Sequence, residues 1–255
     1  MAKKATKRAP KKNAKTGSNK ADWRKVLRWI GIGVLACFIA VIIVFRFVPI
    51  PTTPYILSEK SRLRSVHSEW MPIMEISDTL KLTVVAAEDV NFCQHWGFDM
   101  SAIRAAIKDG GDRGASTLTQ QVVKNTFLWH GRSWARKTLE AFLTPMVELF
   151  WSKKRILEVY LNVAEFDEGV FGAEAASLHY FGISSDSLTL AEAARLAAIL
   201  PDPKGRSASA PTQFVLDRAD NIQDGAVLIQ KDQRSHCFMD CSLRQNYAIY
   251  TLILI

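Results

Sequence analysis

The sequence predicts a mainly α-helical protein with one N-terminal transmembrane helix. Three observations support this prediction: a long uncharged apolar run lies near the N-terminus, helix-start and helix-stop signals recur through the body, and strand-like alternation is scarce. With 255 residues, of which 48% are hydrophobic and 23% are charged, the chain can form one substantial domain with appendages.

The positive charge is concentrated at the N-terminus. Residues 1–28 hold eleven Lys or Arg and a single acid, Asp22, for a net charge of +10, whereas the whole chain carries +8. The rest of the chain is therefore slightly acidic. We expect residues 1–28 to form a basic cytoplasmic tail, disordered over 1–22. The sequence contains no zinc-type Cys/His spacing, RNP-like motif or heptad-linked basic region, so we expect no nucleic-acid partner.

The apolar run covers residues 29–45, seventeen residues without a charge. As a helix it would span about 25 Å, and Phe47 and Val48 extend it while Arg46 can snorkel, so we expect a transmembrane helix at 29–48. A cleaved signal peptide is the rival interpretation, but the run is too long and no Ala-x-Ala site follows. The preceding bases predict a cytoplasmic N-terminus. In a bacterium the domain would then lie in the periplasm, anchored to the inner membrane by this single pass.

Prolines follow the apolar run. Pro49, Pro51 and Pro54 fix their own backbone and disfavour helix before them, so residues 49–54 should be a stiff linker that holds the body close to the membrane. We expect the domain itself at residues 55–215, and we assign no role to residues 216–255.

The four cysteines are scattered at positions 37, 93, 237 and 241. This spacing does not suggest a disulfide framework. We expect isolated thiols, with Cys237 and Cys241 as the pair that could join if oxidised.

Helix signals recur along the body. Asp99 is a plausible N-cap, the spacings Thr117 to Gln120 and Thr189 to Glu192 are capping boxes, and Gly182 and Pro201 are stop signals. The expected helices cover or begin at residues 82–90, 99–108, 117, 133, 153–162, 172–182 and 189.

Two features of the first half of the body suggest chemistry. Glu88 and Asp89 follow the apolar segment 82–87, and a carboxylate at the edge of apolar packing is partly desolvated and can exchange protons near neutral pH. The Gly-rich loop 109–114 runs into a helix start, where free N–H groups suit an anionic or sugar ligand. The alternatives are a solvated acidic pair and an ordinary mobile loop.

A basic cluster lies between residues 124 and 155, a stretch that contains seven Lys or Arg and only two acids, Glu140 and Glu148. This excess suggests a phosphate-binding surface. Arg136 and Glu140 are four apart on a helix and share a face. They could form a structural ion pair, or Glu140 could position a metal ion or a diphosphate.

Five blocks of these residues occur in order. They are Glu88-Asp89-x-x-Phe92-x-x-His95-x-Gly97, Gly114-x-Ser116-Thr117-x-x-Gln120-Gln121-x-x-Lys124-Asn125, Arg136-Lys137-x-x-Glu140, Lys153-x-x-Ile156-Leu157-Glu158-x-Tyr160-x-Asn162, and Gly172-Ala173-x-x-Ala176-x-x-Tyr180-Phe181-Gly182. Together they resemble the peptidoglycan glycosyltransferase domain that class A penicillin-binding proteins share with monofunctional biosynthetic relatives. The resemblance covers about residues 49–212 and leaves no room for a transpeptidase domain, which favours the monofunctional branch.

The resemblance implies a two-lobed, lysozyme-like glycosyltransferase domain that is mainly α-helical, with a cleft opening towards the membrane. Such enzymes build the bacterial cell wall. They polymerise lipid II into β-1,4 glycan strands with inversion and release undecaprenyl diphosphate. The implied partners are lipid II, the growing glycan chain and the inner membrane, and proteins of the division or elongation machinery stay open.

The resemblance also assigns roles to residues. Glu88 would be the base that takes the proton of the acceptor 4-hydroxyl, and Glu140 would lie by the donor diphosphate, with room for a divalent cation (Mg²⁺ or Mn²⁺) and no organic cofactor. Asp89 would orient its loop, and His95 would do this or bind substrate. The expected substrate-binding residues are Asp89, Phe92, His95, Gly114, Ser116, Thr117, Gln120, Gln121, Lys124, Asn125, Arg132, Arg136 and Lys137.

Two other classes of function stay open at this point. A lysozyme-like fold with an essential glutamate also suits an enzyme that cleaves glycan strands, although hydrolysis needs no diphosphate site. A catalytically idle scaffold for wall assembly is the other class, although both Glu88 and Glu140 are present.

Overall fold

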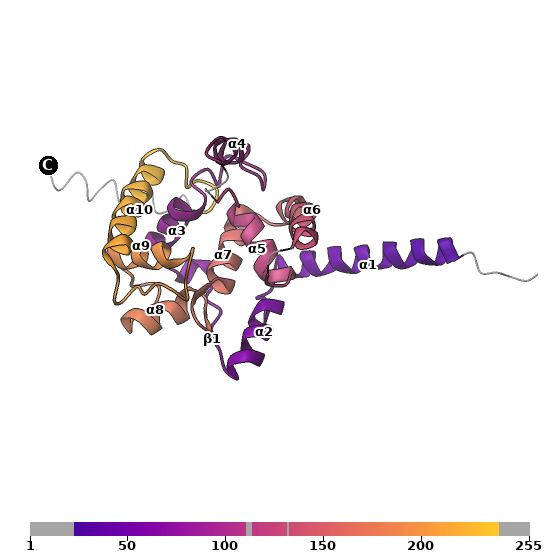
Figure 1. The fold of residues 1–255 in the computed structure, drawn as a ribbon, viewed down its shortest axis with the longest axis horizontal. Helices are drawn as coiled ribbons and strands as arrows, with labels where there is room; N and C mark the ends of the chain where they lie inside the picture. Colours follow the sequence, from indigo (N-terminus) through magenta and orange to yellow (C-terminus); the bar gives the residue numbers. More distant parts are fainter. Residues whose placement is uncertain (1–22, 111–113, 132, 240–255) are drawn as a thin grey trace, which may run out of the picture. The chain divides into compact units, whose positions relative to one another are not determined.

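The computed structural model describes residues 23–110, 114–131 and 133–239 (Figure 1). The chain divides into two compact units, residues 1–40 and residues 41–255. The predicted disorder of residues 1–22 and the apolar end of the chain, residues 241–255, lie outside the described residues.

The first helix, α1 (Trp23–Phe45), is long and apolar enough to cross a membrane, with a mean hydropathy of 2.5. This agrees with a single-pass membrane anchor. The helix begins before the predicted residue 29 because Lys and Arg are good helix formers and do not interrupt it. It ends before the predicted residue 48, since Arg46 and Phe47 form a turn.

The last turn of α1 belongs to the second unit and is bonded to α6 (Trp134–Phe150) and α7 (Lys153–Val163). The indole N–H of Trp151, between these helices, donates to the carbonyl oxygen of Ile42 at 2.7 Å. Arg155 donates to the carbonyl oxygen of Phe45 at 2.8 Å. The bond from Arg155 satisfies a carbonyl group at the helix end, whereas the Ile42 carbonyl also accepts the Arg46 N–H at 3.1 Å.

The second unit is mainly helical, as predicted. Its remaining helices are α2 (Pro54–Leu63), the 3₁₀ turn η1 (Ile73–Glu75), α3 (Asp78–Glu88), α4 (Met100–Lys108), α5 (Leu118–Phe127), α8 (Ala173–Phe181), α9 (Leu190–Ile199) and α10 (Gln213–Lys231). Three short strands, β1 (His67–Ser68), β2 (Glu165–Asp167) and β3 (Val170–Phe171), form a sheet of order β1-β3-β2. Strand β3 runs parallel to β1 and antiparallel to β2.

The helix boundaries follow the capping residues. Both capping boxes form, at Thr117 and at Thr189, and Asp99 caps α4 as predicted. Gly182 ends α8 in the left-handed conformation. Helix α3 begins at Asp78 and not at residue 82, because the Ser77 side chain accepts a bond from the Leu80 N–H at 3.2 Å.

Two groups of helices position the functional residues. Helix α3 packs against α9 and α10, and α5 packs against α6 and α7 (Figure 1). Helix α10 contributes Val215, Ala219 and Ile222 to the buried interior. The predicted domain boundary at residues 215 and 216 therefore falls inside a helix that supports α3.

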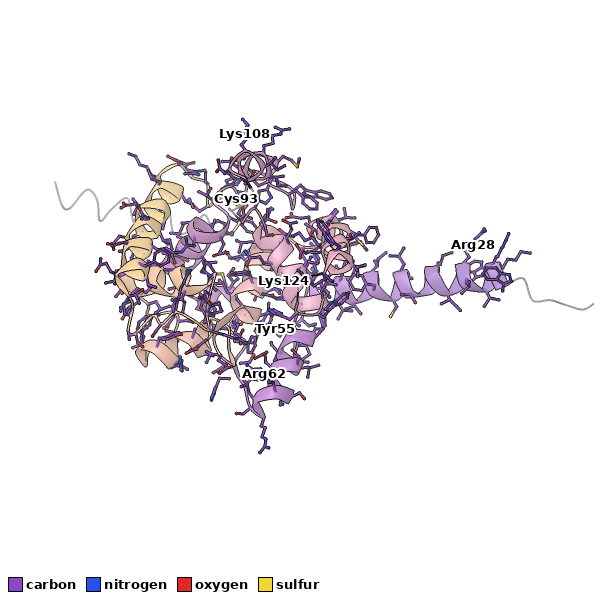
Figure 2. All side chains as sticks on the ribbon, in the orientation of Figure 1. Arg28, Tyr55, Arg62, Cys93, Lys108 and Lys124 are labelled. Carbon is purple, nitrogen blue, oxygen red and sulfur yellow. A yellow bond between two sulfur atoms is a disulfide. The ribbon has the colours of Figure 1, made fainter. Side chains whose placement is uncertain are left out.

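The cysteine prediction is wrong in one respect. Cys93 and Cys237 form a disulfide with a Cα–Cα distance of 5.6 Å, across 144 residues of sequence. Figure 2 labels Cys93, which lies in the loop after α3. Only the tertiary fold returns the chain beyond α10 to this loop, so spacing along the sequence could not indicate the bond. Cys37 is free, and Cys241 lies outside the described residues.

Candidate active site

A cavity of about 790 Å³ opens where the end of α3 meets the start of α5. One wall is the end of α3 and its following loop, and the other is the loop before α5 with the first turns of that helix. Helix α10 contributes one side chain. The lining residues are Ala86, Ala87, Glu88, Asp89, Val90, Asp99, Ala102, Gly114, Ala115, Ser116, Thr117, Gln121, Pro201 and Arg218.

Glu88 is the last residue of α3. Gln121 donates its side-chain N–H to Glu88 Oε2 at 2.8 Å, whereas Glu88 Oε1 is buried and has no hydrogen-bond partner among the described residues. Burial raises the pKa of the Glu88 carboxyl, and the Gln121 bond with the charges of Arg218 and Lys124 oppose this rise. A carboxylate in this state, with one oxygen unused, can accept a proton.

Asp89 joins the two walls of the cavity. Its Oδ2 accepts the backbone N–H of Leu118, the first residue of α5, at 3.0 Å, and its Oδ1 lies 2.8 Å from His95 Nε2. A carboxylate at a helix N-terminus satisfies a free N–H and interacts favourably with the helix dipole. Both oxygens of Asp89 are therefore engaged in holding the loop, and His95 faces Asp89.

Thr117 connects the second wall to the same loop. Its hydroxyl donates to the carbonyl oxygen of Gly97 at 2.7 Å. Gly97 has a φ of +84°, and a Cβ there would lie 2.7 Å from Thr144 Cγ2. Only glycine fits this position without strain. The Gln120 amide closes the capping box, accepting the Thr117 N–H at 3.0 Å.

The basic residues gather around Glu140 on α6. Glu140 is 2% exposed, accepts from Arg136 Nη1 at 2.9 Å and forms a short ion pair with Lys137. Lys137 also reaches Ser116, with 3.2 Å between Nζ and Oγ, and so joins the cluster to the cavity wall. Burial lowers the pKa of Lys124, and the charge of Glu140 opposes this. With three bases around one carboxylate, the cluster is suited to an anion.

Several expected substrate contacts do not line the cavity. Phe92, Gln120 and Asn125 are buried, and Gln120 closes the capping box of α5. The others outside its lining are His95, Lys124, Arg136 and Lys137, of which Lys137 reaches the lining residue Ser116. Arg132 lies outside the described part of the chain.

The donor atoms fit a resident metal ion poorly. Within the described ranges, no group of three His, Cys, Asp or Glu side chains could hold a metal. Both oxygens of Glu140, the expected ligand, are already paired with cations. A divalent cation prefers several oxygen ligands and is repelled by neighbouring positive charges.

Sequence reasoning missed Arg218. This side chain of α10 lines the cavity, its charge lowers the pKa of Glu88, and its buried Nε has no partner within the described residues. The apolar positions 215, 219, 222, 226 and 229 have helical spacing and could have indicated a packed helix here. They do not indicate which cavity its polar side reaches.

Comparison with known proteins supplies the family. The Transglycosylase family model matches residues 56–226. The chain belongs to the transglycosylase family. The matched domain extends beyond the expected limit near residue 212 and includes most of α10, with Arg218.

Three similar proteins from bacteria share the same description. A "Biosynthetic peptidoglycan transglycosylase" of Jannaschia sp. (strain CCS1) is 53% identical over 216 residues, covering 83% of this chain and 90% of the relative. Proteins with the same description from Pseudomonas putida (strain W619) and Pseudomonas fluorescens (strain Pf0-1) are 49% and 50% identical over 205 residues. These matches cover 76% of this chain and 85% and 84% of the two relatives.

Proposed function

We propose that this transglycosylase polymerises lipid II into β-1,4 glycan strands of peptidoglycan, with inversion and release of undecaprenyl diphosphate. The family match and the identity to biosynthetic peptidoglycan transglycosylases over most of the chain support peptidoglycan strand synthesis. The observation that carries the residue roles is the position of Glu88, a buried carboxylate with one unused oxygen in the wall of the large cavity.

Glu88 is the base of this mechanism. Its Oε1 accepts the proton of the acceptor 4-hydroxyl as that oxygen attacks the anomeric carbon of the donor sugar. A pKa raised by burial makes the carboxylate a stronger base at neutral pH. General-base assistance of this kind contributes about 10²- to 10⁴-fold to the rate.

The basic cluster acts on the leaving group. Negative charge builds on the donor diphosphate as the glycosidic bond breaks, and Lys124, Arg136 and Lys137 stabilise it. Glu140 holds Arg136 and Lys137 in place through its two ion pairs. The protein ligands fit a resident metal poorly, so this mechanism assigns each step to side chains of the chain itself.

We place the basic tail, residues 1–28, in the cytoplasm and the domain in the periplasm. The eleven bases before the apolar part of α1 favour this orientation. The Cys93–Cys237 disulfide supports it independently, because structural disulfides persist in oxidising compartments such as the periplasm.

The decisive experiment follows full-length protein in detergent acting on labelled lipid II, with and without Mg²⁺. Wild type should make polymer, and Glu88→Gln should bind lipid II but lose at least about 10²-fold in rate. Glu140→Gln should weaken lipid II binding and lower the rate. Glu75→Gln, an exposed glutamate on η1, is the matched control and should behave as wild type.

Two outcomes would contradict the proposal. Normal polymerisation by Glu88→Gln would remove Glu88 as the base. If wild type made no polymer and instead shortened purified glycan strands without lipid II, the chain would be a cleaving enzyme.

A further inference from the structure

The loop that follows Glu88 carries a residue that joins the two cavity walls. Within residues 89–97, His95 Nε2 lies 2.8 Å from Asp89 Oδ1, and two turn bonds run from the Phe92 N–H to the Asp89 carbonyl at 2.9 Å and from the Gln94 N–H to the Asn91 carbonyl at 2.7 Å. Asp89 also accepts the Leu118 N–H at the start of α5. A covalent tie between this loop and another part of the chain can therefore affect how the two walls meet.

The segment beyond α10, residues 232–239, supplies the covalent tie to this loop. Gln233 adopts a left-handed conformation with a φ of 57°, and the Arg234 N–H bonds back to the Ile229 carbonyl at 3.0 Å. This turn directs the chain back from α10. Cys237 then forms the disulfide with Cys93.

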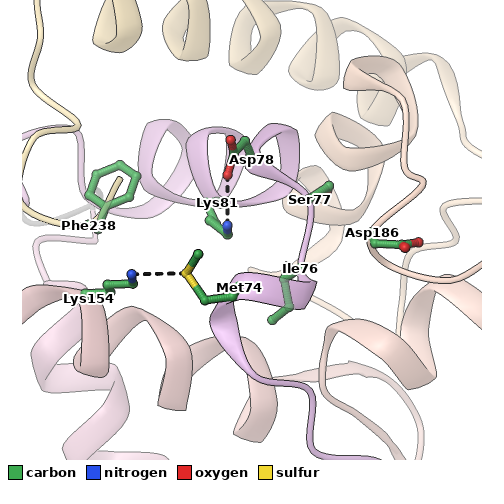
Figure 3. Close-up of a pocket in the computed structure, with 8 residues that line it drawn as sticks. All are labelled: Met74, Ile76, Ser77, Asp78, Lys81, Lys154, Asp186 and Phe238. Atoms are coloured by element: carbon green, nitrogen blue, oxygen red, sulfur yellow. Dashed lines mark hydrogen bonds and ion pairs between the residues drawn. The ribbon is translucent and has the colours of Figure 1, made fainter. Parts of the chain in front are cut away.

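Phe238, next to Cys237 in the chain, packs against the loop at Phe92. It is 2% exposed, and its ring centre lies 6.2 Å from that of the fully buried Phe92. Phe238 also lines a separate pocket of about 230 Å³ together with Lys81 of α3 and Lys154 of α7 (Figure 3). The segment is thus tied to the loop by the disulfide and by the Phe92–Phe238 ring contact.

Phe92 is also connected to α5, through Lys153 and Glu148. Lys153 Nζ lies 4.5 Å from the centre of the Phe92 ring, and the same amine pairs with Glu148 at 2.7 Å. Glu148 accepts a bond from the Thr119 hydroxyl, in the first turn of α5, at 2.6 Å. A continuous set of contacts therefore runs from the disulfide to the wall of the cavity that faces Glu88.

We propose that the Cys93–Cys237 disulfide is an oxidative modification that locks residues 89–97 in the conformation needed for glycan polymerisation. Cys93 stands between Phe92 and His95 in the first motif block, next to residues that hold the site. In the reaction, the two thiols lose two protons and two electrons and form one S–S bond. A protein disulfide of a thiol oxidase accepts the electrons by thiol–disulfide exchange and becomes a dithiol.

Reduction should act on the loop more than on the whole domain. The helix interfaces do not involve the disulfide, whereas the loop loses its covalent tie to residues 232–239. Asp89 is then held less firmly against α5, and the cavity walls separate more often. We expect about tenfold slower polymerisation, since displacing a positioned group by about 1 Å can cost up to 10²-fold.

Peptide mapping under non-reducing conditions tests the bond itself. Full-length protein from the cell envelope, alkylated before digestion, should yield a peptide that links Cys93 to Cys237. A Cys237–Cys241 link, or alkylated Cys93 and Cys237, would overturn the proposal. This result does not depend on activity.

A phosphine reductant tests the consequence, which rests on the proposed polymerase function. Wild type should lose about tenfold in rate on full reduction and regain it on reoxidation. A Cys93→Ser/Cys237→Ser variant should be slow already and insensitive to the reductant, and Cys37→Ser should respond as wild type. An unchanged rate in fully reduced wild type would overturn the proposal.

Amide hydrogen exchange distinguishes a local effect of the disulfide on the loop from a general stabilisation of the domain. On reduction, exchange should rise in residues 89–97 and 232–239 and stay constant in α6 and α7. Equal acceleration throughout the domain would contradict a local lock. If oxidised wild type made no polymer, the proposed function would fail, but the peptide map and the exchange pattern would still decide the lock.

Discussion

At the scale of single residues, the site depends on how differently Glu88 and Asp89 are bonded. Both oxygens of Asp89 are occupied, by His95 and by the Leu118 N–H, whereas Glu88 uses one oxygen and the other has no partner in the part of the chain that the structure describes. Adjacent carboxylates thus have different surroundings, which suit Asp89 to holding its loop and Glu88 to the proposed role of base.

The charge of Arg218 should set the acidic limb of the pH–rate profile. Arg218 lowers the pKa of Glu88, so Arg218→Met should raise that pKa further and leave less of the base ionised at low pH. The acidic limb should therefore move to higher pH, with a larger loss of rate at pH 6 than at pH 8. Polymerisation rates across this range would measure it.

Arg218→Lys is the matched control, because it keeps the positive charge and should keep the acidic limb. Lys231→Met, which removes an exposed charge at the end of the same helix, should change nothing. An unmoved limb in Arg218→Met would show that the guanidinium does not act on Glu88.

Glu88 should also reduce stability at neutral pH. Burial raises its folded-state pKa above the unfolded value, so ionised Glu88 destabilises the fold as the pH rises through that unfolded value. Glu88→Gln should therefore raise the melting temperature at pH 7, by about 2–4 °C for each kcal/mol gained. Calorimetry from pH 4 to pH 8 should find the gain shrinking towards pH 4. A lower melting temperature at pH 7 would contradict the burial argument.

At the scale of elements, the loops between helices decide whether the two cavity walls meet. The loop after α3 is joined to the start of α5 by Asp89 and by the Thr117 bond to Gly97, and the disulfide joins it to the segment after α10. Helices supply rigid walls, and these few contacts set the distance between them.

Gly97 provides a test of this loop. Gly97→Ala would place a Cβ 2.7 Å from Thr144 Cγ2 at a φ of +84°. Gly110→Ala has a similar φ of +80° but no atom within 4 Å of the added Cβ, so it isolates the backbone strain. We expect a loss in the free energy of unfolding of about 1–2 kcal/mol for Gly110→Ala and a further loss of about 1–3 kcal/mol for Gly97→Ala.

Denaturant unfolding of the two variants measures this difference. Polymerisation should also fall in Gly97→Ala and stay near wild type in Gly110→Ala. Equal destabilisation by both substitutions would show that the loop has room to move away from α6.

At the scale of the whole molecule, the anchor and the domain must meet the same membrane-bound substrate. Helix α1 is apolar enough to span a bilayer, and its last turn is bonded to Trp151, between α6 and α7, and to Arg155 of α7. The proline-restricted linker begins directly after it. A domain tethered this closely suits a substrate whose lipid part stays in the bilayer.

The proposed orientation predicts from which side of the membrane a protease can reach the domain. Protease added to spheroplasts should digest the domain and leave a fragment that contains residues 1–45. Inverted membrane vesicles should protect the domain and lose the basic tail. Immunoblots against tags at each end would measure both, and the opposite pattern would overturn the orientation.

The sequence by itself determined whatever depends on neighbours along the chain. Caps at Asp99, Thr117 and Thr189, the stop at Gly182 and the apolar run of α1 act within a few residues, so their spacing predicted these boundaries. The five motif blocks, taken in order, were enough to indicate the family that the comparisons show.

The tertiary structure decided what depends on contacts between distant segments. The Cys93–Cys237 bond, the orientation of Arg218 towards Glu88 and the burial of Phe92 and Asn125 follow from how α3, α5 and α10 pack. Burial and proximity are properties of the packed chain. The same residue types at the same spacing could lie in a core or line a cavity, and only the packing distinguishes the two.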